Sequence, residues 1–280
     1  MSGALAIRWN GAPVAQIPAL GRGLHYGDGV FRTVLLHEGR VIAMEAQLDK
    51  LVADAAAIGI RPPSIDLLRE ELGAVTSFGA AAIKLLLVRA GEQRGYKPAS
   101  DVADRLLIVY PPPPAASAHA IEGIHAIRSP VTMATQPLLA GIKHLNRLEQ
   151  VLASRDWPEG VAEAILGDDR GTPVCATRAN LFWVRHGVLH TPALDRCGIA
   201  GVTRSRVLAL AEAAGIECRI GSQPWSALLA ADEVFVCGSL IGIWPLRALD
   251  AHCYQAQRPM TRRLQAALGH PTHVHYLSPR

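Results

Sequence analysis

Four consecutive prolines at residues 111–114 constrain the fold of this chain more than any other stretch. Such a run favours an extended, semi-rigid connector. Small residues follow at 115–118. We therefore predict an N-terminal α/β domain at 1–112, a linker at 113–118 and a C-terminal domain at 119–280.

The composition is that of a globular protein without nucleic-acid or membrane features. The 280 residues are 50% hydrophobic, which supports a sizeable core in one large or two medium domains. The net charge of +4, without a run of Lys or Arg, argues against nucleic acid and suits a small anionic partner. The start of the chain lacks a signal-peptide pattern, and the longest apolar run, 234–246, is too short to span a membrane. We expect a cytoplasmic protein with no membrane or nucleic-acid partner.

The spacing of cysteines and histidines predicts neither disulfides nor a metal site. The cysteines are scattered and odd in number, without a Cys-x-x-Cys pair, as is typical of reduced thiols. The histidines at 273 and 275 lack further ligands nearby, so we interpret them as part of a tail. The cysteines are Cys175, Cys197, Cys218, Cys237 and Cys253.

Hydrophobic periodicity and turn signals predict a mixture of strands and helices. Strands are expected at 7–9, 14–17, 30–37, 81–89, 106–110, 123–128, 162–167, 180–184, 188–191 and 233–237. Helices are expected at 44–58, at 65–75 with Ser64 as the N-cap, and at 202–214 with Gly215 as the C-cap.

Residues 140–153 are interpreted as a glycine-marked entry into an amphipathic helix. The apolar stripe recurs at helical spacing, at Leu145, Leu148, Val151 and Leu152. Lys143 comes just before this stripe, where partial desolvation would lower the pKa of its amine and leave more of it neutral. A neutral amine is a nucleophile that forms Schiff bases. Lys143 is therefore either a catalytic lysine or a solvated lysine at a helix start.

A glycine-rich stretch at 21–33 marks backbone that turns tightly or approaches another group closely. Its glycines lack the spacing of a dinucleotide-binding loop. The residues by themselves indicate a turn that feeds the strand at 30–37.

Two of these stretches resemble one enzyme family. The segment at 141–153 is similar to the lysine segment of the fold-type IV pyridoxal-phosphate enzymes, and most similar to that of their aminodeoxychorismate lyases. The run Tyr-Gly-Asp-Gly-Val-Phe at 26–31 resembles the N-terminal signature of the same family. The resemblance implies a two-domain α/β fold of the α+β type, with a smaller N-terminal domain and a larger C-terminal domain that anchors pyridoxal 5'-phosphate. It also implies a homodimer.

The resemblance also assigns roles to residues. Lys143 becomes the lysine that forms the Schiff base with the cofactor. Lys50 stands where the family has a phosphate-binding arginine, and it offers a point charge without the bidentate fork. Free N–H groups at the helix start, the Thr203 hydroxyl, and the backbone and hydroxyl of Ser239 match phosphate positions. The implied cofactor residues are Lys50, Cys175, Val202, Thr203 and Ser239.

One position departs from the family pattern. The family has a glutamate five residues before the Asn of an Asn-Leu-Phe strand, where it keeps the pyridine nitrogen protonated. Here that strand begins at Asn180, and the matching residue is Cys175. A thiol is a weak donor and a weak acceptor, so it does not hold the nitrogen protonated and the electron sink is weakened.

The implied reaction converts 4-amino-4-deoxychorismate to 4-aminobenzoate and pyruvate, a step of folate biosynthesis. Aromatisation drives this reaction, so it tolerates a weaker sink better than transamination does. The substrate is anionic, which predicts polar and cationic side chains around it. Two alternatives stay open: a D- or branched-chain amino-acid aminotransferase of the same fold, and a binding protein that has lost the usual cofactor chemistry. The substrate-binding candidates are His25, Tyr26, Thr33, Arg94 and Tyr96.

Overall fold

The computed structural model describes residues 3–114 and 117–273, which form two compact units. Unit 1 comprises Met1–Pro114 together with Ile142–Asn146. Unit 2 comprises Ala115–Gly141 and Arg147–Arg280. The sequence assigns all of 119–280 to one domain, whereas the short segment around Lys143 packs with the N-terminal unit.

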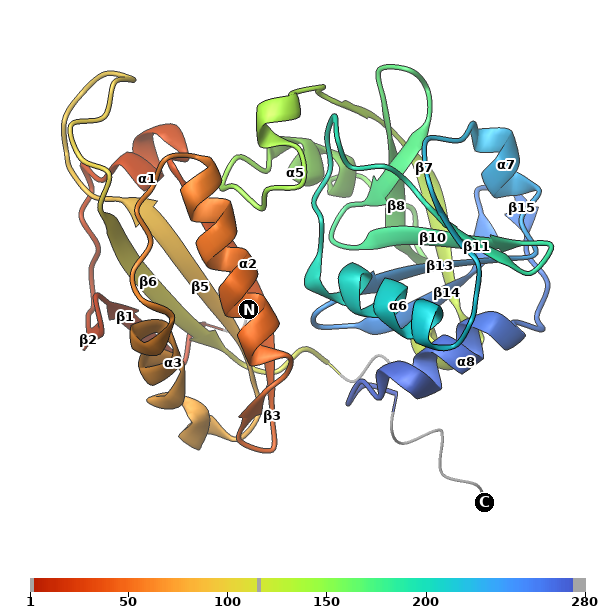
Figure 1. Ribbon diagram of the computed structural model, residues 1–280, viewed down its shortest axis with the longest axis horizontal. Helices are drawn as coiled ribbons and strands as arrows, with labels where there is room; N and C mark the ends of the chain where they lie inside the picture. Colours follow the sequence, from red (N-terminus) through yellow and green to blue (C-terminus); the bar gives the residue numbers. More distant parts are fainter. Residues whose placement is uncertain (1–2, 115–116, 274–280) are drawn as a thin grey trace. The chain divides into compact units, whose positions relative to one another are not determined.

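Unit 1 is built on a six-stranded antiparallel sheet in the order β2-β1-β6-β5-β3-β4 (Figure 1). The two longest strands, β3 and β5, pair along most of their length, with Val34 opposite Ile83. Alternate residues of both strands face one side of the sheet, as a half-covered sheet requires. The strands are β1 (Ala6–Trp9), β2 (Ala12–Pro13), β3 (Gly29–His37), β4 (Arg40–Val41), β5 (Ala81–Arg89) and β6 (Ala103–Tyr110).

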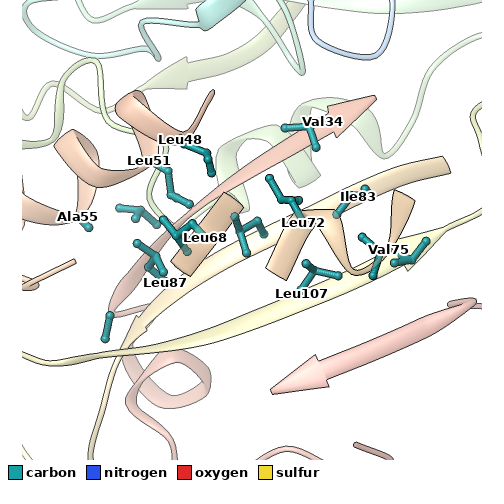
Figure 2. Packing of buried hydrophobic residues seen from close by; sticks show 14 of the residues in the cluster. Val34, Leu48, Leu51, Ala55, Leu68, Leu72, Val75, Ile83, Leu87 and Leu107 are labelled. Carbon is teal, nitrogen blue, oxygen red and sulfur yellow. The ribbon is translucent and has the colours of Figure 1, made fainter. Parts of the chain in front are cut away.

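Helices α2 (Met44–Ala57) and α3 (Ile65–Gly73) cover that side of the sheet. Figure 2 shows their leucines packed against the strands. Each such buried leucine contributes roughly 1.5–3 kcal/mol to stability. The predicted cap of α3 is confirmed, because the Ser64 hydroxyl accepts the Leu67 N–H at 3.3 Å. The labelled residues are Val34, Leu48, Leu51, Ala55, Leu68, Leu72, Val75, Ile83, Leu87 and Leu107.

Two N-terminal predictions differ from the structure. The strand predicted at 14–17 is wrong, because β2 ends at Pro13. After Val14, whose N–H donates to Ile7 O, the residues through Ile17 form no strand, and Ile17 is exposed. The alternating pattern therefore has no face to bury. The glycine-rich stretch forms the short helix α1 (Arg22–Tyr26) before β3, which the sequence indicated only as a turn.

Unit 2 contains a closed barrel. Its sheet runs β12-β11-β10-β13-β14-β7-β8-β9, and β9 also pairs with β10, which closes the ring. The closing pair is Asn180 opposite Cys175. The strands are β7 (Ile124–Met133), β8 (Val161–Asp168), β9 (Pro173–Ala176), β10 (Asn180–Arg185), β11 (Val188–Thr191), β12 (Cys218–Ile220), β13 (Glu233–Gly238), β14 (Gly242–Leu249) and β15 (His252–Cys253).

The two faces of the barrel have separate cores. Side chains such as Leu181, Val236 and Leu246 fill the interior. On the outer face, Phe182 and Phe235 pack against α6 and α8. The unit's helices are α4 (Ser117–Glu122), α5 (Leu148–Ser154), α6 (Val202–Ala213), α7 (Trp225–Leu229) and α8 (Pro259–Leu268). Across 3–114 and 117–273, every helix is too short or too polar to cross a membrane.

The predicted α+β fold of the fold-type IV enzymes is confirmed by these two units and by the comparisons below.

The amphipathic helix predicted at 140–153 is wrong in where it begins and in the burial of its apolar stripe. Residues 142–146 are not helical, and α5 begins only at Leu148. Leu148, Val151 and Leu152 are 75%, 60% and 52% exposed. The segment pairs with a strand edge instead, so a tertiary hydrogen bond overrides the helical pattern.

Candidate active site

Lys143 lies in a segment that extends the sheet of unit 1. The β4 strand pairs with only the last residues of β3, so the first part of β3 has an open edge. There the Phe31 N–H donates to Lys143 O at 2.9 Å, and the Leu145 N–H donates to Gly29 O at 3.0 Å. His144 forms a bridge with Val30. The backbone of Lys143 is thus held in place at the edge of the sheet.

The amine of Lys143 lies against an aromatic ring. Its Nζ is 4.5 Å from the centre of the Phe31 ring, and the Nζ of Lys84 is 4.7 Å from the same ring. Lys84 stands opposite Thr33 across β3 and β5. Because residues two apart on a strand point to one face, Phe31 and Thr33 lie on that face with Lys84.

Lys84 is a further candidate site residue, to which the sequence patterns gave no role. Burial lowers the pKa of its ammonium group. A lysine with a lowered pKa whose ammonium group lies near the same ring as a candidate nucleophile is a functional candidate. The signal was present in the sequence, since Lys84 interrupts an otherwise apolar strand.

A buried carboxylate, Asp54, links Lys143 to Lys50, the residue predicted to bind the cofactor phosphate. Its side chain is 1% exposed. Oδ2 accepts the Lys143 N–H at 3.1 Å and also pairs with Arg32, while Oδ1 pairs with Lys50. Burial lowers the pKa of Arg32, and Asp54 opposes that shift. The sequence analysis missed Asp54, although its i,i+4 spacing from Lys50 on α2 was visible.

The predicted phosphate cradle at the start of α6 is organised by Asn180. Its Nδ2 donates to Ile199 O at 2.7 Å, and its Oδ1 accepts the Gly201 N–H at 3.2 Å. A Cβ on Gly201 would lie 2.3 Å from that oxygen, so the position requires glycine. The first turn of α6 carries Val202 and the buried Thr203, has no acidic residue, and leaves N–H groups without an intrahelical acceptor.

The loop before α6 is also bound on its other side. The Gly141 N–H donates to Gly198 O at 3.0 Å, and the Ala200 N–H donates to Gly141 O at 3.1 Å. Lys143 follows Gly141 by two residues in the chain.

Ser239 begins the turn between β13 and β14, and two C-terminal histidines hold this turn. His270 Nε2 donates to Ser239 O at 3.0 Å, and His273 Nε2 accepts the Ile243 N–H at 2.9 Å. Burial lowers the pKa of His273, which keeps the ring neutral and able to accept. The interpretation of His273 as part of a tail is therefore wrong, while residues 274 and 275 lie outside the described part of the chain.

Cys175 lies on the outer face of the barrel. Directly opposed residues of paired strands share a face, so its side chain lies on the same face as that of Asn180. Its Sγ donates to Met133 Sδ at 3.5 Å. Burial raises the pKa of the thiol to about 12, so Cys175 stays protonated at neutral pH.

The two acids whose charge acts on Cys175 are engaged elsewhere. Glu163 on β8 is fully buried and lies two residues from Ile165, which faces the barrel interior, the opposite face. Glu149 Oε1 accepts the Ala134 N–H at 2.7 Å. The departure at Cys175 is thus not repaired by either carboxylate.

The structure groups the predicted substrate residues unevenly. Tyr26 Oη accepts the Gly95 N–H at 2.9 Å, and its ring lies 5.7 Å from that of Tyr96, which is 89% exposed. His25 and Arg94 are both exposed. Among these candidates, Thr33 is the one that shares a sheet face with Phe31.

An unpredicted arginine network supports the tyrosines. The buried Arg22 donates to the carbonyls of Gly95 and Tyr96, at 2.9 and 3.3 Å, and its Nε donates to Asp28 at 2.8 Å. Arg89 binds the same carboxylate at 3.0 Å. This network fixes the loop at 91–96 onto unit 1.

Known enzymes are similar to the chain over nearly its whole length. A family profile described as amino-transferase class IV matches residues 29–249. The aminodeoxychorismate lyase of Vibrio harveyi is 32% identical over 268 residues, which cover 93% of this chain and 98% of that enzyme. The crystal structure of 4-amino-4-deoxychorismate lyase from Pseudomonas aeruginosa has a TM-score of 0.89 and 38% identity, and covers 94% of this chain and 97% of that one. The branched-chain-amino-acid aminotransferase of Escherichia coli K12 is 30% identical over 279 residues, which cover 93% of this chain and 88% of that enzyme.

The chain therefore belongs to the class IV aminotransferase family, the fold-type IV pyridoxal-phosphate enzymes. The resemblance inferred from the lysine segment is confirmed. Members of this family use pyridoxal phosphate. The matched range includes Lys50, Lys143, Cys175, Thr203 and Ser239, whereas Tyr26 and His25 precede it.

Proposed function

We propose that this chain is a lyase that converts 4-amino-4-deoxychorismate into 4-aminobenzoate and pyruvate, a reaction of folate biosynthesis. The observation that carries the proposal is the placement of Lys143, whose backbone is held by β3 and Asp54 and whose amine lies beside Phe31. Similarity to two lyases over nearly their full lengths supports the choice of substrate.

The residues present fit pyridoxal phosphate at its aldehyde and its phosphate. Lys143 would hold the cofactor covalently, and the α6 N–H groups with Thr203 and Ser239 would hold the phosphate. The uncapped first turn of α6 and the close approach of Gly201 to Asn180 support this assignment.

The proposed reaction needs one proton removed and one delivered. When bound, pyridoxal phosphate supplies an electron sink for a bond broken at the amine-bearing carbon. That carbon loses a proton, the bond from the ring to the enolpyruvyl oxygen breaks, and pyruvate leaves after gaining a proton. The amine of Lys143 takes the first proton. Thr33, on the sheet face that carries Phe31, is the candidate donor to the leaving pyruvate, and Lys84 supplies positive charge for a substrate carboxylate.

The environment of Cys175 favours the lyase over an aminotransferase. Its thiol is protonated and lies in an apolar cluster, so it gives the pyridine nitrogen no negative partner. Transamination depends on that partner to stabilise the carbanion until it is reprotonated at another carbon. Elimination to an aromatic ring has its own driving force and needs less help from the ring nitrogen.

The test combines a product assay with mapping of the lysine. Protein loaded with pyridoxal phosphate should release pyruvate from 4-amino-4-deoxychorismate with no amino acceptor present. Borohydride reduction and peptide mass mapping should place a pyridoxyl group on Lys143. Lys143→Ala should abolish both results, whereas Lys97→Arg, at an exposed lysine, should change neither.

Two outcomes contradict the proposal. Amino transfer to a 2-oxo acid without pyruvate release would assign an aminotransferase. A loaded protein without a pyridoxyl group on Lys143 would refute the assignment of the lysine itself.

A further inference from the structure

Asp54 joins three groups of unit 1 that come from three separate parts of the sequence. Arg32 comes from β3, Lys50 from the same helix as Asp54, and Lys143 from the segment at 142–146. The carboxylate is 1% exposed, and each oxygen has a separate task. Oδ1 pairs with the Lys50 ammonium group, while Oδ2 binds Arg32 and the Lys143 N–H. A shift of Asp54 therefore changes the positions of Lys50 and of the Lys143 backbone together.

We infer that Asp54 is a positioning residue that couples an anion-binding cation, Lys50, to the placement of Lys143. This inference rests on the proposed function, in which Lys143 carries pyridoxal phosphate. A lysine ammonium group lies at the end of a flexible four-carbon stem and gives a poorly directed charge by itself. Pairing with a buried carboxylate fixes that direction. The same carboxylate fixes the Lys143 backbone, so both ends of one ligand would be aligned by a single side chain.

Arg32 makes this arrangement compatible with an anionic ligand. Asp54 and Lys50 alone would form a neutral pair and would attract a phosphate only weakly. With Arg32 the cluster holds two cations and one anion, a net charge of +1. Arg32 is 3% exposed, and its Nε has no hydrogen-bond partner among residues 3–114 and 117–273. Its guanidinium group binds the same carboxylate through Nη2.

Stability alone does not account for such a cluster. A buried ion pair is often no more stable than an apolar replacement of the same volume, because desolvation offsets the attraction. Removing one member, in contrast, is strongly destabilising. Asp54 therefore has to be tested against another buried pair of the same unit. Glu71 on α3 is such a control, since its Oε1 accepts from Arg105 Nε at 2.9 Å and its side chain is 8% exposed.

The experiment compares Asp54→Asn, Lys50→Gln and Glu71→Gln. Amide hydrogen exchange of the peptide that contains 142–146 is measured on cofactor-free protein. The dissociation constants of pyridoxal phosphate and pyridoxal are measured on the same proteins, and their ratio reports the preference for the phosphate group. Asp54→Asn should speed exchange of the Lys143 amide by at least tenfold and lower the phosphate preference, because the Lys50 ammonium group loses the carboxylate that directs it. Adduct formation on Lys143 should slow.

Lys50→Gln separates the two effects. It should lower the phosphate preference by at least tenfold and leave the Lys143 amide as slow as in the unaltered protein. Glu71→Gln should alter neither readout. If Asp54 had only a structural role, Asp54→Asn would weaken the binding of pyridoxal phosphate and of pyridoxal equally. The inference is overturned if the Lys143 amide exchanges as slowly in Asp54→Asn as in Glu71→Gln, if Asp54→Asn keeps or raises the phosphate preference, or if Lys50→Gln keeps the phosphate preference. If the proposed function is wrong, the unaltered protein will form no adduct on Lys143. The exchange measurement does not depend on that result, because it uses cofactor-free protein.

Discussion

The Asn180 side chain holds the backbone just before α6 in place. The variant Asn180→Ala therefore tests the predicted phosphate cradle at the start of α6. The asparagine binds Ile199 O through Nδ2 and the Gly201 N–H through Oδ1. Alanine removes both partners and leaves the two backbone groups unsatisfied. The turn that presents Val202 and Thr203 then loses its link to β10.

The magnitude follows from these two bonds. A buried backbone group that loses its partner costs about 1–3 kcal/mol. Ile199 and Gly201 are only partly buried, so water replaces part of each bond. We therefore expect a loss of about 2–3 kcal/mol, which corresponds to a fall in Tm of about 4–12 °C for a unit of this size. Affinity for pyridoxal phosphate should fall by on the order of tenfold, the equivalent of about 1.4 kcal/mol.

The assay follows unfolding by calorimetry and binding by titration with pyridoxal phosphate and with pyridoxal. Asn10→Ala is the matched control, because Asn10 also makes two side-chain bonds, to Asp104 and to the Arg105 N–H, but on an exposed turn of unit 1. The phosphate-bearing ligand should lose more affinity than pyridoxal. Equal losses for both ligands, or a stability loss no larger than that of Asn10→Ala, would refute the role given to Asn180.

Three further predictions concern thiols. Cys175→Glu should reduce the stability of cofactor-free protein by several kcal/mol, since it buries a carboxylate in an apolar cluster. In the loaded protein it should shift the visible spectrum and raise the rate of side transamination of amino acids. An unchanged spectrum together with an unchanged transamination rate would place Cys175 away from the ring nitrogen. Burial raises the pKa of Cys175 and Cys237 to about 12, above the value in the unfolded chain. These thiols stay protonated in the folded protein while the unfolded chain ionises, so the free energy of unfolding should fall between about pH 9 and 12, by about 1.4 kcal/mol per pH unit for each thiol. Iodoacetamide at pH 8.5 should label the exposed Cys253 and spare both; early labelling of Cys175 in folded protein would contradict its burial.

Local patterns were sufficient for most of the elements and for recognising the family. The helix at Met44–Ala57 and the strand at Ala81–Arg89 follow from periodicity, which acts within one segment. The Lys143 segment and the glycine-rich signature were recognisable because both are contiguous runs. The start of α6 was predicted for the same reason, since a glycine followed by a helical pattern is a local signal.

Residues that act through tertiary partners were not predictable in this way. Asp54 accepts an N–H that lies 89 positions further along the chain, and His273 accepts one from Ile243. No spacing rule connects such pairs. The failure at 140–153 has the same origin: the helical stripe was present, but the open edge of β3 offered the backbone hydrogen bonds that a helix would have made within itself.

The two departures from the family pattern differ in whether their surroundings compensate for them. Lys50 lacks the fork of an arginine, but it pairs with Asp54, and Arg32 keeps the cluster positive, so in the proposed site a positive charge remains for the phosphate. Cys175 has no such support, because Glu163 faces the barrel interior and Glu149 binds the Ala134 N–H. In the proposed site, the chain therefore keeps a positive charge for the phosphate and leaves the ring nitrogen without a charged partner. That combination suits the lyase reaction, in which the substrate gains stability as its ring becomes aromatic. It is unfavourable for transamination, which depends on the cofactor to stabilise the carbanion.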